Sequence, residues 1–148
     1  MDTSHNRRLG AALLALAVYG SPAVMAQAAP DQLFQDLGQE AGIGLIVDRM
    51  LVLVGQDARI REAFKDTNMK RLAKLLKEQF CAISNGPCHY SGDDMKTVHD
   101  KMGIRSAQFN ALAEDLQLAM EQLDIPAAIQ NKLLARLAPM KRDIVAPE

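Results

Sequence analysis

The chain has 148 residues, which is enough for one domain and too few for two. Its formal net charge is −1 and no basic cluster exceeds a few residues, so we expect no nucleic-acid partner. Hydrophobic residues make up 49% of the chain, whereas aromatic residues make up only 4% and tryptophan is absent. This composition favours an all-α domain with a core of Leu, Ile, Val, Met and Ala.

The first segment has the pattern of a secretory signal peptide. Arg7 and Arg8 precede an apolar or small run from Leu9 to Tyr19, and small residues offer a cleavage site after residue 26 or residue 28. The run is well short of the ~20 residues of a membrane span, although an uncleaved anchor is the alternative. We therefore predict a signal peptide over residues 1–26 and no stable membrane span after cleavage.

The export route follows from the same segment. Paired arginines suggest twin-arginine export, but the residues Leu9-Gly10-Ala11 fit that signal poorly. General secretion is favoured, so the mature protein is expected to be periplasmic or secreted.

The mature domain is expected over residues 31–146. A short amphipathic segment, 31–38, ends at a glycine, and apolar residues at three- and four-residue steps predict a helix over 39–54 that stops at Gly55. The stripe of this helix is predicted to be Leu45, Ile46, Met50, Leu53 and Val54. Residues 57–64 form a short helical connector.

The middle of the chain is less regular. Thr67 or Asn68 is the predicted N-cap of a helix over 69–84, which Asn85-Gly86-Pro87 ends by turn chemistry. Its apolar stripe is Leu72, Leu75, Leu76, Phe80 and Ile83. An irregular stretch, 88–92, then precedes a short helix over 93–102.

The last third of the chain predicts two helices. Ser106 is the expected N-cap of the first, and Pro126 suits the first turn of the second. The buried faces are predicted to be Phe109, Leu112, Leu116, Met120 and Leu123 on the first helix, and Ile129, Leu133, Leu134, Leu137 and Met140 on the second. The sequence has no strand pattern or internal repeat.

His99 is the best candidate for a metal ligand. Met95, Val98, Ile104 and Phe109 surround it with apolar walls. A metal-ligating imidazole commonly has its other ring nitrogen held by a backbone carbonyl, and a short helix can supply that carbonyl from one turn earlier. The alternative is a solvated or hydrogen-bonded structural histidine.

Cys81 and Cys88 are a candidate disulfide pair. In a continuous helix their Cα atoms would be about 10.5 Å apart, beyond the ~7 Å that a disulfide permits, but the break at Asn85-Gly86-Pro87 removes this obstacle. Export to an oxidising compartment favours the bond; two free thiols are the alternative. No Cys-x-x-Cys-His is present, so covalent haem attachment through such a motif is not expected.

Several motifs together resemble one known family. They are Leu33-Phe34 with Leu37-Gly38, Val47-Asp48, Phe64 with Thr67-Asn68-Met69, Phe80-Cys81, Asn85-Gly86-Pro87-Cys88, Tyr90 to Met95, Val98-His99, Gly103-Ile104, Phe109, and Pro139-Met140 with Asp143-Ile144-Val145. Over roughly Leu33 to Val145 the chain is similar to the bacterial group 1 truncated haemoglobins. The resemblance implies a two-over-two α-helical sandwich that binds non-covalent haem b through the iron ligand His99.

The resemblance also implies a set of haem contacts. They are Leu51, Phe64, Leu72, Leu76, Phe80, Tyr90, Met95, Ile104 and Phe109. Phe64 falls where the family places the phenylalanine that packs on the haem face, although an ordinary core role fits the same position. Tyr90, with Lys74 and Arg71, could reach the haem propionates or could be a surface residue.

The departures from the family bear on ligand binding. Met50-Leu51 stands where the best-known members have Phe-Tyr, and Leu72 and Leu76 stand where a distal glutamine is common. A lost donor removes about 1 to 3 kcal/mol per hydrogen bond to bound dioxygen, which is roughly 5-fold to 150-fold in affinity. We therefore expect an apolar distal pocket at a five-coordinate iron. Asn85 replaces a usual glycine but tolerates left-handed backbone angles.

Three functions follow from this sequence. The first is reversible binding of dioxygen, nitric oxide or carbon monoxide, with an unidentified reductant. The second is a haem enzyme that detoxifies nitric oxide or peroxide, against which stands the lack of a distal acid or base. The third is a haem carrier or a helical interaction module in which His99 is structural.

Overall fold

The computed structural model describes residues 32–147, so the predicted signal peptide lies outside the described residues. Within residues 32–147 the regular secondary structure is helical and contains no strand. The elements are α1 (Leu33–Asp36), α2 (Gln39–Gln56), η1 (Arg61–Phe64), α3 (Met69–Ile83), α4 (Met95–His99), α5 (Ser106–Glu121), α6 (Ala127–Leu137), η2 (Ala138–Met140) and α7 (Lys141–Ile144). None of the helices in this part of the chain is long and apolar enough to cross a membrane.

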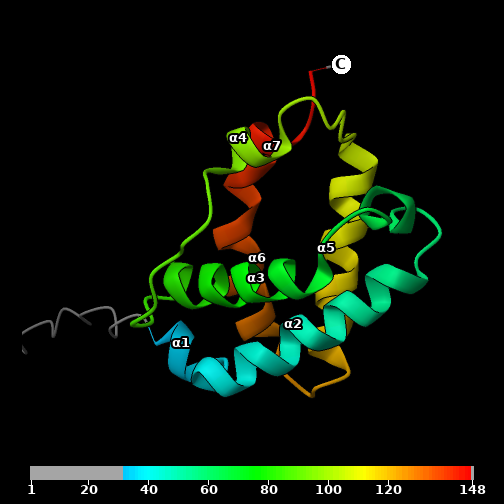
Figure 1. Ribbon diagram of the computed structural model, residues 1–148. Helices are drawn as coiled ribbons and strands as arrows, with labels where there is room; N and C mark the ends of the chain where they lie inside the picture. The colour runs from blue at the N-terminus through cyan, green and yellow to red at the C-terminus, as the bar shows by residue number, and fades with distance from the viewer. Residues whose placement is uncertain (1–31, 148) are drawn as a thin grey trace, which may run out of the picture.

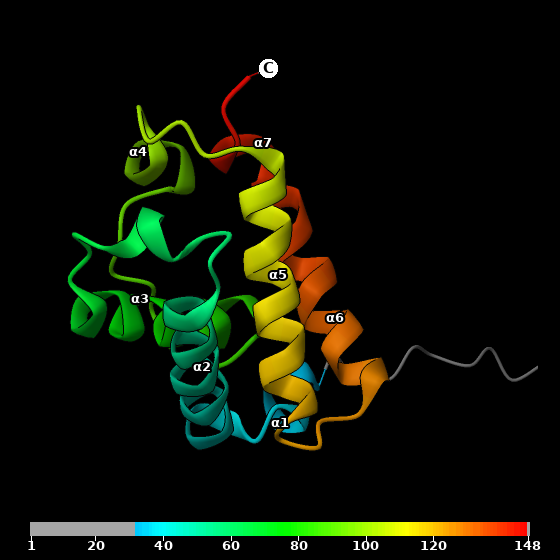
Figure 2. The same cartoon turned by 90° about the vertical axis from the view of Figure 1, so that its right-hand side faces the viewer.

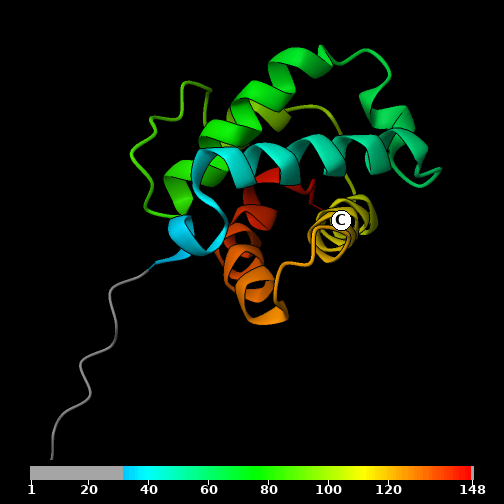
Figure 3. The same cartoon turned by 90° about the horizontal axis from the view of Figure 1, so that it is seen from below.

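The long helices form two antiparallel pairs. Figure 1 shows α2 and α3 running in opposite directions, and Figure 2 shows α5 and α6 side by side. Seen from below, α2 runs across the view while α5 is nearly end-on, so the two pairs cross (Figure 3). This arrangement confirms the predicted all-α, two-over-two fold.

The core lies where α2 meets α3 and α5. The face of α2 that enters it consists of Ile43, Ile46, Val47, Met50 and Val54. Each fully buried side chain of this size contributes about 1.5 to 3 kcal/mol relative to exposure. The prediction that Leu45 belongs to this face is wrong, because Leu45 is 61% exposed. It lies one position before Ile46, which is about 100° away around the helix.

The ends of α2 and α3 follow from local chemistry. Gly38 precedes α2 with a φ of 81°, which glycine adopts readily. Gly55 does not stop α2, because a single glycine is tolerated inside a helix and the backbone turns extended only at Asp57. Asn68 is the N-cap of α3, and its side chain accepts a hydrogen bond from the Arg71 backbone N–H at 3.0 Å.

The helix that carries His99 is shorter than predicted, and the helix after it begins one residue earlier. Asp94 caps α4, so the helix covers Met95–His99 and not 93–102. After His99 the chain turns through Lys101 and Gly103, both at positive φ, which a helix does not allow. Arg105, not Ser106, is the N-cap of α5. The chain continues past α6 into η2 and α7, where the sequence predicted only one helix.

Candidate functional site

His99 is held by its own helix. Its Nδ1 lies 2.8 Å from the backbone oxygen of Met95, one turn earlier. A carbonyl oxygen can only accept, so the Nδ1–H donates and the lone pair of the neutral ring resides on Nε2. The side chain is half-buried. The contact with a carbonyl one turn earlier is the one that the sequence analysis expected, whereas the role of Nε2 as a metal ligand stays a prediction.

The position of α4 depends on the segment before it. Figures 1 and 2 show α4 beside α7, on the opposite side of α3 from α2. Residues 84–94 lead from the end of α3 to α4 without helical hydrogen bonding of their own. Contacts between this segment and α3, together with the packing of α4 on α7, therefore position His99.

The first of these contacts is a disulfide. Cys81 of α3 is joined to Cys88 with a Cα–Cα distance of 5.7 Å. Gly86 passes so close that an added Cβ would lie 2.6 Å from Cys81 Sγ and 2.5 Å from the Phe34 ring. Asn85 takes a φ of 61°, which asparagine tolerates. The turn chemistry of this break therefore brings the two cysteines together.

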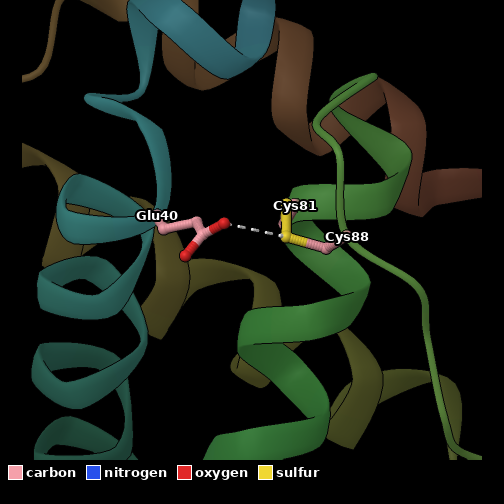
Figure 4. The surroundings of a disulfide bond; sticks show 3 residues. All are labelled: Glu40, Cys81 and Cys88. Atoms are coloured by element: carbon pink, nitrogen blue, oxygen red, sulfur yellow. Dashed lines mark hydrogen bonds between the residues drawn. A yellow bond between two sulfur atoms is a disulfide. The ribbon is translucent and has the colours of Figure 1, made fainter.

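Glu40 of α2 lies beside the disulfide (Figure 4). Its Oε1 is 3.7 Å from Cys88 Sγ, but a disulfide sulfur has no hydrogen to donate. Glu40, Cys81 and Cys88 are the one group of metal-ligand residue types that come together in the part of the chain that the structure describes. A disulfide offers no thiolate, so the oxidised pair does not form a metal centre.

The second contact involves Glu78 of α3. One carboxylate oxygen accepts hydrogen bonds from the Ser91 backbone N–H at 3.1 Å and from the Ser91 hydroxyl at 2.7 Å, and the other pairs with Lys74. The Lys74 ammonium also donates to Ser91 Oγ at 3.1 Å. The hydrogen bonds from Lys74 and Ser91 lower the pKa of Glu78 to about 2. Glu78 thus holds the middle of the segment as a carboxylate.

Tyr90 makes its contacts within the same segment. Its hydroxyl donates to the backbone oxygen of Asp93 at 3.1 Å, and its ring packs on Gly92, where an added Cβ would lie 2.3 Å from the hydroxyl oxygen. Burial raises the pKa of Tyr90, and the Asp93 charge adds to this effect. A role at the haem propionates stays a prediction for this residue, as it does for Lys74 and Arg71.

The predicted haem contacts come from six parts of the fold. Leu51 is on α2 and Phe64 is on η1. Leu72, Leu76 and Phe80 are on α3, Tyr90 is in the segment before α4, and Met95 is on α4. Ile104 lies just before α5, and Phe109 is in its first turn. Phe80 is only 2% exposed and belongs to the main core, whereas the other eight are half-buried. Their role as haem contacts stays a prediction.

Gln79 is a residue that the sequence analysis missed. It is 8% exposed, and its amide nitrogen lies 3.5 Å from Met95 Sδ and 3.6 Å from Met140 Sδ. It follows Leu72 and Leu76 at helical steps of four and three residues, so all three lie on one face of α3. The helical spacing from Leu72 and Leu76 could have identified Gln79 as a residue of this face. The sequence analysis missed it because it counted only apolar residues in the stripe.

A shallow groove of about 430 Å³ borders His99 from the direction of α7. Its lining includes Lys96, Asp100, Arg142 and Val145, and none of Leu51, Leu72 or Leu76. This groove therefore contains none of the leucines that the sequence analysis predicted for the distal pocket.

Comparisons with known proteins agree with this architecture. The family model described as bacterial-like globin matches residues 32–146. Group 1 truncated hemoglobin GlbN of Mycolicibacterium paratuberculosis is 30% identical over 82% of this chain and 90% of its own length. Group 1 truncated hemoglobin of Tetrahymena thermophila is 30% identical over 74% of this chain and 91% of its own.

Solved structures share the fold. The truncated hemoglobin of Tetrahymena pyriformis in its Fe(III) form superimposes with a TM-score of 0.75 at 24% identity, over 78% of this chain and 98% of that one. The 2/2 hemoglobin of Synechococcus sp. PCC 7002, in a structure described as having covalently attached heme, gives a TM-score of 0.72 at 22% identity, over 77% and 98%. With nearly its whole described length matched, the chain belongs to the bacterial-like globin family, among the truncated haemoglobins of group 1.

Proposed function

We propose that this protein holds haem iron through His99 and reversibly binds dioxygen, nitric oxide or carbon monoxide. The observation that carries the proposal is the 2.8 Å contact between His99 Nδ1 and the Met95 carbonyl. It places the proton of the neutral ring on Nδ1, directs Nε2 away from its own helix and makes that nitrogen a better donor to a metal. When bound, haem supplies an iron with one axial position for the histidine and one for a small ligand.

The described residues fit a porphyrin. The half-buried predicted contacts carry no formal charge, which suits a flat apolar macrocycle. Because both cysteines are joined in a disulfide, neither has a free thiol that could bond to haem. His89 is exposed in the segment before α4. These facts support a non-covalent haem b, in contrast to the covalently attached heme described for the Synechococcus protein.

The side chains of the distal surface govern which ligands stay bound. Leu51, Leu72 and Leu76 have no hydrogen-bond donor, so they exclude water but give no stabilisation to a polarised ligand. Dioxygen is therefore expected to leave quickly, and carbon monoxide, which needs less hydrogen bonding, is held comparatively well. This pattern favours transient ligand binding over tight dioxygen storage.

The expected periplasmic or secreted location is part of the proposal. The Cys81–Cys88 disulfide supports it, because such bonds persist in oxidising compartments. A reductant that keeps the iron ferrous is required there, and its identity is open.

Spectral titration tests the proposal. Apoprotein mixed with haem should saturate at one haem per chain, and after reduction it should give a five-coordinate ferrous spectrum that converts to a six-coordinate spectrum with carbon monoxide. Failure to reach one haem per chain, or a ferrous spectrum that is six-coordinate without added ligand, contradicts it.

A further inference from the structure

Gln79 interrupts an otherwise apolar face of α3. Leu72, Leu76, Gln79 and Ile83 follow one another at steps of four, three and four residues, which places them in one row along the helix. The row begins with two of the leucines assigned to the distal surface. A leucine at position 79 would complete the row without burying a polar group.

The partners of the Gln79 amide are unusual. The amide nitrogen is directed at two thioether sulfurs, Met95 Sδ at 3.5 Å and Met140 Sδ at 3.6 Å. Thioethers are weak acceptors, so an amide that is 8% exposed gains less here than it would from a carbonyl. We therefore look for the role of Gln79 in the elements that its amide connects, which are α3, α4 and η2.

The contact joins the distal helix to the proximal one. Met95 is the first residue of α4, and its backbone oxygen is the acceptor for His99 Nδ1. The helix has only five residues and packs chiefly on α7. Movement of Met95 therefore moves the acceptor that orients the His99 ring.

Two other contacts hold the segment between α3 and α4, but neither of them reaches α4 itself. The disulfide fixes Cys88, and Glu78 fixes Ser91. The Gln79 contact comes last along the chain, at Met95, and its second partner Met140 belongs to η2. The amide thus fastens the start of α4 to α3 and η2 at one point.

We propose that Gln79 is a positioning residue for the proximal histidine, acting through Met95. Its amide holds the first turn of α4 and so sets the orientation of the His99 ring toward the metal. The inference rests on the proposed function, since His99 must be the iron ligand for the orientation to matter. It assigns Gln79 to the proximal side, although its helix supplies the distal wall.

The test replaces the amide and keeps the volume. Gln79→Met removes the donor, and Gln130→Met is the matched control, because Gln130 is also buried and donates to the Ile125 carbonyl at 2.8 Å on α6. In the apoprotein, hydrogen exchange of the His99 Nδ1–H, followed by nitrogen-edited NMR, should speed up in Gln79→Met and not in the control. The expected change is roughly 2-fold to 10-fold, the range for losing one ordinary hydrogen bond.

The haem-loaded proteins give the second readout. In ferrous Gln79→Met the iron–histidine stretching band in resonance Raman spectra should move or broaden, and haem transfer to an excess of another apoglobin should be roughly 2-fold to 10-fold faster. The C–O stretch of the carbon monoxide complex should not change. Gln79→Asn, which keeps the amide but withdraws it by one methylene, should act in the same direction if Gln79→Met fails to fold.

The outcomes separate the two claims. Unchanged exchange and an unchanged iron–histidine band in a folded variant overturn the positioning role. A shifted C–O stretch with an unchanged iron–histidine band also overturns it, since Gln79 would then act on the bound ligand. If the unmodified protein takes up no haem, the proposed function fails, and the exchange measurement on the apoprotein still decides whether Gln79 positions His99.

Discussion

A single imidazole ring carries the proposed chemistry, and the chain offers a matched control for it. His99 Nδ1 is held by a carbonyl, whereas His89 is exposed in the segment before α4. We expect His99→Ala to abolish stable haem binding or to weaken it markedly, and His89→Ala to leave it unchanged. Spectral titration of both variants is the measurement. Haem uptake by His99→Ala with unchanged affinity and an unchanged ferrous spectrum would show that the proximal assignment is wrong.

The proposed apolar distal pocket predicts that a change at Leu51 alters ligand selectivity. Leu51→Tyr introduces a hydroxyl donor worth about 1 to 3 kcal/mol to bound dioxygen, so dioxygen dissociation should slow by roughly an order of magnitude or more. Carbon monoxide dissociation should change far less. Leu45→Tyr on the same helix is the control, because Leu45 is exposed and lies off the buried face. Stopped-flow measurement gives the dissociation rates of both ligands in both variants. If Leu45→Tyr slows dioxygen dissociation as much as Leu51→Tyr does, Leu51 does not line the pocket.

The resemblance to a known family predicted a role for His99, and hydrophobic spacing missed Gln79. The hydrogen bond from a helical histidine to a carbonyl one turn back is local, so it could be expected once His99 was singled out. The Gln79 amide depends on Met95 and Met140, which are far along the chain, and hydrophobic periodicity gives no weight to a polar residue within a stripe.

Among the elements, the segment between α3 and α4 depends most on its cross-link. Closing a loop of this length stabilises the folded state by about 2 to 3 kcal/mol. Cys88→Ser should therefore lower the free energy of unfolding by about that amount. Denaturant unfolding of both proteins, with and without reductant, checks this: reductant should destabilise the unmodified protein and have little effect on the variant. Thiols that react with an alkylating agent without reductant would contradict the disulfide.

The same segment should make the protein sensitive to acid. Hydrogen bonds from Lys74 and Ser91 depress the folded-state pKa of Glu78 to about 2, from an ordinary value of 4.5. The stabilising effect is thus fully present above about pH 4.5 and is lost as the pH falls toward 2. Glu78→Gln should reduce the slope of stability against pH in this window, whereas Glu62→Gln on η1 should not. Equal slopes for the unmodified protein and Glu78→Gln in thermal melts across this range would contradict the assignment.

Helix positions were predictable, and their ends were less so. The stripes predicted α2, α3, α5 and α6 because each has enough residues for a clear period. Helix α4 was predicted too long because Asp94 as N-cap and Lys101 at positive φ are backbone properties that hydrophobic spacing does not report. The division of the last helix into α6, η2 and α7 was missed for the same reason.

In the whole molecule, the pair formed by α2 and α3 crosses the pair formed by α5 and α6 (Figure 3). Composition predicts helices but not how the layers cross, since a Leu-rich stripe packs equally well on several partners. The resemblance to truncated haemoglobins supplied that arrangement, and the fold confirms it. The assignment of Leu51, Leu72 and Leu76 to the distal side rests on the resemblance alone and stays a prediction.

The most direct test is the rate at which the unmodified ferrous protein releases dioxygen, compared with its release of carbon monoxide. An apolar distal surface of Leu51, Leu72 and Leu76 predicts rapid dioxygen release and comparatively slow carbon monoxide release, both measured by stopped-flow replacement. Dioxygen release as slow as that of the Leu51→Tyr variant would mean that a polar group stabilises the ligand, and it would contradict the apolar pocket.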